Sequence, residues 1–316
     1  MKRVAWIYHP DYLLHTPPFE HPESPERLVA ITDHLGGTGL IDRMVPVTPD
    51  YPEDTDILSV HDREYLKRLE SACRRGDLTL DSEDTYLNRH SFNIALLSAG
   101  GAIAGAKAVA EGTVDRAFCA IRPPGHHAGR DAGMGFCLLN NAAVAARYLQ
   151  ARHGVGKVLI VDWDVHHGNG TEEIFYEDGS VLYCSTHQWP LYPGTGEAAD
   201  TGRGAGEGLN LNLPFHSGAG RDQIIGALKD KLVPAADRFK PDLVLVSAGF
   251  DARQGDPLAG LTLTDEDFAE MTALVLDIAR RHAHGRLVST LEGGYRLDGL
   301  AAACTAHVRA LADVRE

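Results

Sequence analysis

Hydrophobic and polar residues along this chain fall into short apolar runs separated by longer segments of helical periodicity. The short runs are rich in β-branched residues and predict strands at Val4–Tyr8, Ala117–Ile121, Lys157–Trp163, Val181–Ser185, Leu209–Leu213, Asp242–Ala248 and Arg286–Leu291. The longer segments predict helices at Pro25–Leu35, Ser91–Glu111, Asn140–Arg152, Asp222–Phe239, Asp265–Arg281 and Leu297–Ala312. Thr264 and Ser91 are expected N-caps of two of them. This alternation predicts an α/β fold, with a mostly parallel central sheet covered by helices on both faces.

Length and composition favour one domain over residues 1–316, because no low-complexity segment, repeat or linker interrupts the pattern. The formal net charge of −14 argues against nucleic acid or an anionic membrane surface as a partner. The five cysteines are scattered without a C-x-x-C pair, so neither a disulfide framework nor a cysteine zinc site is expected. The first apolar run is too short for a signal peptide, and Lys107 and many small residues make the helix from Ser91 a packed one rather than a membrane span. We expect a cytoplasmic protein, and the sequence is compatible with a homo-oligomer.

Polar residues cluster beyond the carboxyl ends of several predicted strands. They are His126 and His127 in RPPGHHAG, Asp162, Asp164 and His166 in VDWDVHHGNG, Asp251 in SAGFDARQGDP and Tyr295 in LEGGY. Ligands of open parallel sheets bind at this edge. The sequence therefore predicts one site assembled from distant segments.

Two carboxylates and one imidazole in this cluster could hold a metal ion. Asp162, Asp164 and His166 are two residues apart, so they would share one face if the strand continued. Asp164 and His166 could share a cation, to which Asp251 would be the third ligand. Such a set leaves a fourth position for water, as in catalytic zinc sites.

The motifs also predict the number of metal ions. Manganese ureohydrolases such as arginase share this sheet type and carry D-x-H-x-D and D-x-D segments. Here His167 and Gly168 follow the D-x-H segment, and Ala252 and Arg253 follow Asp251. The carboxylates for a second catalytic ion are missing, which favours a single ion. Manganese or iron in place of zinc stays open, because ligand type does not fix the metal.

The segments RPPGHHA, GMGFCLLNN, DWDVHHGNGT, GFDARQGDPL and EGGY, in this order and spacing, resemble the zinc-dependent histone deacetylase family. The resemblance is to class II and bacterial class-II-like members above all, and it runs from about Tyr8 to the last helix. Acetylpolyamine amidohydrolases belong to the same superfamily. The resemblance implies an arginase/deacetylase-like fold and a hydrolase that acts on linear amides with one zinc ion.

The resemblance implies a role for each matching residue. The zinc ligands would be Asp164, His166 and Asp251. His127 would be the general base and then the acid toward the departing amine, and His126 an electrostatic and orienting partner. Tyr295 would donate its hydroxyl to the oxyanion, Asp162 would hold His126, and Asn169 would hold His127. A structural potassium ion is also implied, bound through side-chain or main-chain oxygens of Asp162, Asp164, His166, Ser185 and Thr186.

Two adjacent histidines with different partners suit amide hydrolysis. The attacking water must lose a proton and the poor leaving amine must gain one. A carboxylate partner favours the charged imidazolium, whereas a neutral amide does not. The different partners would therefore separate the behaviour of His126 from that of His127.

The substrate channel is also expected from the resemblance. Phe136 and Tyr192 match two facing aromatic walls that suit the slender, apolar stem of lysine. The other implied substrate-site positions are Leu258, Asp84, Gly135 and Gly294, with Arg27 near an acetate exit. Leu258 stands where a polyamine-selective relative has Glu, which favours an acyl-lysine substrate. The loop HTPPFEHPESPE could still narrow the entrance, and Glu20, Glu23 and Glu26 within it could attract a polyamine.

The leading hypothesis is a zinc-dependent amidohydrolase that removes acetyl or short acyl groups from lysine side chains of peptides or proteins. One alternative is an amidohydrolase of acetylpolyamines or other small amides. The other is an inactive module that only binds acyl-lysine or a partner protein. The intact ligand set, together with His127 and Tyr295, speaks against inactivity, because a binding module would not need them all.

Overall fold

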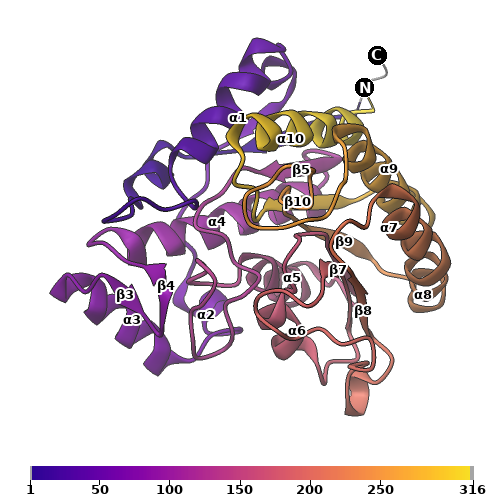
Figure 1. The fold of residues 1–316 in the computed structure, drawn as a ribbon. Helices are drawn as coiled ribbons and strands as arrows, with labels where there is room; N and C mark the ends of the chain where they lie inside the picture. The colour runs from indigo at the N-terminus through magenta and orange to yellow at the C-terminus, as the bar shows by residue number, and fades with distance from the viewer. Residues whose placement is uncertain (1, 314–316) are drawn as a thin grey trace.

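The computed structural model describes residues 2–313, and a parallel eight-stranded sheet forms the centre of this region (Figure 1). The strand order is β2-β1-β5-β10-β9-β6-β7-β8. The bounds of these strands are β1 Val4–Ile7, β2 Val45–Val47, β5 Arg116–Cys119, β6 Val158–Asp162, β7 Val181–Gln188, β8 Asn210–Phe215, β9 Leu243–Ala248 and β10 Leu287–Leu291. Every predicted strand is present within a few residues of its expected bounds, and the predicted fold class is confirmed.

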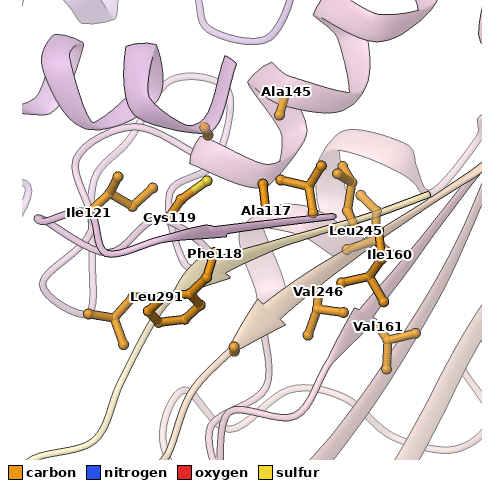
Figure 2. Packing of buried hydrophobic residues seen from close by; sticks show 14 of the residues in the cluster. Ala117, Phe118, Cys119, Ile121, Ala145, Ile160, Val161, Leu245, Val246 and Leu291 are labelled. Carbon is orange, nitrogen blue, oxygen red and sulfur yellow. The ribbon is translucent and has the colours of Figure 1, made fainter. Parts of the chain in front are cut away.

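Helices cover both faces of this sheet. On one face, α4 (Ser91–Ala110) packs against α5 (Asn141–His153) and β5. On the other, α10 (Leu297–Leu311) packs against both α1 (Glu26–Gly37) and α9 (Asp265–His282) (Figure 1). Figure 2 shows Ala117 and Cys119 of β5 on the side of Ala145 from α5, while Phe118 points to the opposite side. The strands are apolar on both faces, as expected for a sheet buried on both sides.

The long apolar helix α4 belongs to the core. By length and composition alone Ser91–Ala110 could cross a membrane, but 72% of its most apolar window is buried inside the fold. The predicted packed helix is therefore confirmed. The expected N-cap at Ser91 is wrong: His90 is the N-cap, and Ser91 begins the helix with its Oγ accepting from the amide of Asn88. Thr264 does cap α9, through a reciprocal pair of bonds with Asp267.

The helix predicted over Asp222–Phe239 consists of three parts. It begins as α7 (Arg221–Ala227), widens into a π-helical turn at Leu228–Leu232 and continues as α8 (Val233–Phe239). Pro234 lies at the start of α8 and has no N–H to donate to the preceding turn. The interruption at this position follows from that missing donor.

Several short or polar elements were not predicted. They are α2 (Asp54–Ile57), α3 (Arg63–Arg75), α6 (Asn169–Phe175), the hairpin of β3 (Thr79–Leu80) and β4 (Ser82–Tyr86), and 3-10 turns at Pro10–Leu14, Ile41–Arg43 and Gly204–Gly206. The edge strand β2 was also missed. Strand β4 and helix α6 lie beside the predicted site, and each contributes a residue to it.

Candidate active site

The four strands that carry the predicted site residues, β5, β10, β9 and β6, are neighbours in the sheet. Their carboxyl ends therefore form one continuous edge. Strand β6 ends at Asp162, one residue before its predicted end, so it does not continue to His166, and the next residues form bends. These bends still bring Asp164, His166 and Asp251 together, with ligand atoms within 4.8 Å of one another and all three residues buried.

The donor set at this edge fits a divalent cation. His166 Nδ1 lies 3.1 Å from Asp164 Oδ1 and 3.3 Å from Asp251 Oδ2, and the latter oxygen makes no hydrogen bond. Burial and the charge of Asp164 raise the pKa of Asp251 to about 7, because two adjacent buried carboxylates repel each other. A Cβ at Gly293 would collide with both carboxylates, so only glycine leaves this space open. Two carboxylates and an imidazole in a buried pocket match the ligand chemistry of a catalytic metal with an open position.

Two adjacent histidines lie beside this cluster, with ring centroids 4.0 Å apart. His126 Nδ1 contacts Asp162 Oδ2 at 3.0 Å, whereas His127 Nδ1 contacts Asn169 Oδ1 at 2.7 Å. Both expected partnerships are therefore present. Asn169 is the first residue of α6, and Asp162 is the last of β6.

These partners give the two histidines opposite pKa shifts. Burial lowers the pKa of His126, but the carboxylates of Asp162 and Asp164 outweigh burial and raise it to about 10. Burial, together with the charges of His126 and His166, lowers the pKa of His127 well below its usual value. His126 is thus suited to remain an imidazolium, while His127 is suited to accept a proton.

Tyr295 follows β10 and reaches the same space. Its ring lies 5.8 Å from that of Phe136, and the guanidinium of Arg27 lies 5.0 Å from its centroid. Burial raises the pKa of Tyr295 well above the ordinary value, so its hydroxyl keeps its proton. Its main-chain N–H donates to Asp256 at 2.8 Å, which fixes the backbone beneath the ring.

A cavity of about 220 Å³ leads to these groups. Its lining residues are Asp84, His127, Gly135, Phe136, His166, Leu191, Tyr192, Leu258 and Tyr295. It is small and largely apolar, and its polar groups include the buried His127 and His166 and the partly exposed Asp84. Burial and Asp84 both raise the pKa of Tyr192, whose ring meets that of His127 edge-on at 5.2 Å.

A model of the histone deacetylase domain matches residues 21–311. The chain belongs to the histone deacetylase family. A "probable deacetylase" of Archaeoglobus fulgidus is 42% identical over 295 residues, which cover 93% of this chain and 81% of that protein. A "histone deacetylase-like amidohydrolase" of Pseudomonas aeruginosa is 44% identical over 276 residues, or 87% of this chain and 72% of that protein. The crystal structure of the HDA15 HD domain superposes with a TM-score of 0.93 at 40% identity, covering 98% of this chain and 88% of that one.

The remaining expected site residues of this histone deacetylase domain lie around the cavity rather than in its lining. Arg27 is fully buried, and its Nε donates to the carbonyl of Gly294 at 2.7 Å. Arg27 also donates to the carbonyl of Glu292. Gly294 is therefore engaged through its main chain and does not line the cavity. An acetate exit at Arg27 stays a prediction.

The residues expected to bind potassium lie next to the candidate metal-binding cluster. Asp162 and Ser185 are register partners on β6 and β7, and both are fully buried. Thr186 follows on β7 and is also buried. The Asp162 carboxylate accepts from the Tyr183 hydroxyl at 3.0 Å, in addition to its contact with His126.

The suggestion that Glu23 could attract a polyamine is wrong. Its side chain is fully buried and pairs with Arg122 at 2.6 Å and with Arg27 at 3.2 Å. Burial raises the pKa of Glu23, but the two guanidinium groups outweigh burial and lower it to about 2. Glu23 is a buried anion that pairs with Arg27, the guanidinium over the Tyr295 ring, and it has no free charge to offer.

Three further residues were missed in the sequence. Leu191 lines the cavity directly before Tyr192. Asp256 fixes Tyr295, and the buried Glu292 accepts from the amides of Gly125 and His126 at 2.7 and 3.1 Å. Asp256 and Glu292 stand inside the motifs GFDARQGDPL and EGGY. The motifs therefore marked both positions, but they did not indicate which main-chain groups these carboxylates would bind.

Proposed function

We propose that this protein is a zinc-dependent deacylase that removes acetyl or short acyl groups from lysine side chains of peptides or proteins. The observation that carries the proposal is the small cavity, whose lining joins the apolar Phe136, Tyr192 and Leu258 to the polar His127, His166 and Tyr295. Its small volume and apolar walls suit a chain of methylenes that ends in an amide. Asp164, His166 and Asp251 would hold the zinc ion, which would supply a Lewis acid and lower the pKa of water.

The two histidines would divide the proton transfers. When Nδ1–H of neutral His127 donates a hydrogen bond to Asn169 Oδ1, Nε2 is free to take a proton from the attacking water. The water oxygen forms a bond to the amide carbon, and the C–N bond breaks as His127 returns the proton to the departing amine. The products are a carboxylic acid and the free lysine amine. Charged His126 would stabilise the negative charge that develops during attack.

Tyr295 would donate its hydroxyl to the carbonyl oxygen as that oxygen gains charge. The stacked guanidinium of Arg27 and the bond from Tyr295 N–H to Asp256 hold the ring in place. A donor fixed before the reaction begins stabilises the transition state without a reorganisation cost.

We also propose a structural potassium ion near Asp162, Ser185 and Thr186. Supporting this assignment, these residues lie on adjacent strands and are buried beside the catalytic cluster. Since a bound ion stabilises only the folded state, potassium should raise the melting temperature in a concentration-dependent manner, and sodium at equal ionic strength should raise it less.

The decisive experiment compares kcat/KM of the zinc-loaded protein for an acetyl-lysine peptide and for acetylspermidine. We expect the peptide to be preferred, because Leu258 offers no anion for a remote ammonium group. A preference for acetylspermidine would instead favour a polyamine amidohydrolase. No turnover of either substrate, with zinc bound, would favour the binding module. The variant Tyr295→Phe is the control, because turnover that stays unchanged in a preparation of this variant would come from a contaminating enzyme.

A further inference from the structure

The channel wall Tyr192 lies on an irregular segment between β7 and β8. Tyr192 is 38% exposed, its ring meets those of His127 and His166 edge-on at 5.2 and 6.2 Å, and its hydroxyl interacts with Asp84 and the main chain of Gly135. These contacts act on the ring. The main chain that carries the ring is held by the way the segment is anchored to the rest of the fold.

Four contacts anchor the residues that follow Tyr192. They are Thr195 Oγ1 with His167 Nδ1 at 2.8 Å, the Gly196 carbonyl with His187 Nε2 at 2.9 Å, the Glu197 carbonyl with Asn212 Nδ2 at 3.3 Å, and the Asp200 carbonyl with Asn210 Nδ2 at 2.6 Å. The rings of His167 and His187 lie 4.8 Å apart. A Cβ at Gly196, where φ is +94°, would come within 2.6 Å of His167 Cγ, so the segment approaches these rings as closely as glycine allows.

Three of these four anchors converge on one carboxylate. Glu172 Oε2 accepts from Asn210 Nδ2 at 2.6 Å and from Asn212 Nδ2 at 2.7 Å, and it lies 3.2 Å from His167 Nε2. The Glu172 side chain is only 14% exposed. Burial raises its pKa, but the bonds and charge of His167 and the bonds from the asparagines outweigh burial and keep the carboxylate ionised.

We propose that Glu172 is a positioning residue for the substrate channel. It orients His167, Asn210 and Asn212 so that they form hydrogen bonds with residues 195–200, and these bonds hold the segment that places Tyr192 against His127. The proposal rests on the proposed acyl-lysine channel for its effect on catalysis, but the anchoring itself is a property of the fold.

Hydrogen exchange measured by mass spectrometry tests the anchoring without any substrate. In Glu172→Ala, we expect faster amide exchange in residues 189–200 and unchanged exchange in β6 and β9. Glu172→Gln keeps an oxygen acceptor for the asparagines and should show an intermediate effect. The matched control is Glu177→Ala, which removes an exposed carboxylate that pairs with Arg203 just beyond α6. Unchanged exchange in residues 189–200 of Glu172→Ala would overturn the proposal.

A double-mutant cycle on the acetyl-lysine peptide tests the route to catalysis. We expect Glu172→Ala to raise KM about tenfold with little change in kcat, since a loosened wall weakens binding of ground state and transition state alike. In a Tyr192→Ala background the same change should alter KM by less than about twofold, because coupled residues do not act additively. An equal effect in both backgrounds would show that Glu172 does not act through Tyr192.

Hydrogen exchange and the double-mutant cycle together distinguish a failure of the Glu172 proposal from a failure of the proposed deacylase function. If the parent protein hydrolysed neither substrate, the proposed function would fail, while the exchange data would still decide whether Glu172 anchors the segment. If Glu172→Ala did not fold, Asn212→Ala removes one anchor and one donor to Glu172 but leaves the carboxylate and its other two contacts in place. It should speed exchange around Glu197 in particular, and a failure to do so would count against the anchoring.

Discussion

The floor and the walls of the cavity are built in different ways. On the floor, main-chain N–H groups donate to every key carboxylate: Asp164 N to Asp162, His166 N and Gly293 N to Asp164, and Val165 N to Asp251. The walls Phe136, Tyr192 and Leu258 instead stand on loops and contribute mainly apolar surface. Directional bonds from a rigid sheet edge define atom positions, whereas apolar contact is non-directional. Changes on the floor should therefore abolish chemistry, and changes in the walls should mainly alter binding.

The largest effect is expected from Asp251→Asn on the floor. The amide keeps the shape of the side chain but cannot supply the negative charge that a divalent cation needs. We expect loss of nearly all turnover, together with loss of bound metal after dialysis, measured by atomic emission. Asp298→Asn, at an exposed carboxylate, is the control. A full metal complement in Asp251→Asn would remove this residue from the ligand set.

Tyr295→Phe should have the next largest effect. Loss of one preorganised oxyanion donor costs on the order of 3 kcal/mol, or a hundredfold or more in kcat. Metal content and melting temperature should not change, because the ring still packs against Phe136 and Arg27. Steady-state kinetics and thermal unfolding check both halves of this prediction, and unchanged kcat would exclude Tyr295 from the mechanism.

The same difference between floor and walls explains what could be predicted from the sequence. The floor residues stand directly after apolar strands, so a coarse strand assignment placed them at one edge without any knowledge of contacts. The floor residues lie at the predicted sheet edge even though β6 ends at Asp162, because residues 163–166 cannot move far from the strand end. Local sequence therefore predicted that Asp164, His166 and Asp251 come together, whereas the two histidine pairings came from the family resemblance.

The missed features depend on long-range contacts or weak local patterns. Glu23 reads as a solvated charge, and only the folded chain brings Arg122, 99 residues away, against it. Strand β2 is three residues long and contains Pro46, which excludes it from a sheet interior but not from this edge. The amphipathic helix α3 did carry a signal, since Tyr65, Leu69 and Ala72 lie on one buried face and Gly76 ends it at a φ of 81°.

Asn169→Asp tests the difference between the two histidines of the floor, since it gives His127 a carboxylate partner like the one that His126 has in Asp162. A carboxylate raises the pKa of an adjacent imidazole by about one unit or more. Because His127 must be neutral to accept a proton, the acid limb of kcat/KM should move to higher pH by that amount. Below the apparent pKa of this acid limb, kcat/KM should fall about tenfold per pH unit, with little loss on the alkaline side.

The measurement is a pH profile of kcat/KM for the wild-type protein and the variant, with Asn169→Ala as the control that removes the partner without adding charge. If the acid limb stayed in place while activity fell uniformly, Asn169 would orient His127 without tuning its pKa. The different partners of the two histidines would then serve geometry rather than proton affinity.

The smallest effect is expected at the rim, from Leu258→Glu. A carboxylate there could pair with the remote ammonium of acetylspermidine, and an exposed pair contributes about 0.2–1 kcal/mol. The ratio of kcat/KM for acetylspermidine to that for the peptide should thus rise only a few-fold, mostly through KM, and the gain should shrink with added salt. Leu258→Gln separates charge from shape. A ratio that does not respond to charge at Leu258 would place selectivity in the entrance segment around Phe19 and His21, where His21 packs on Phe136 at 4.6 Å.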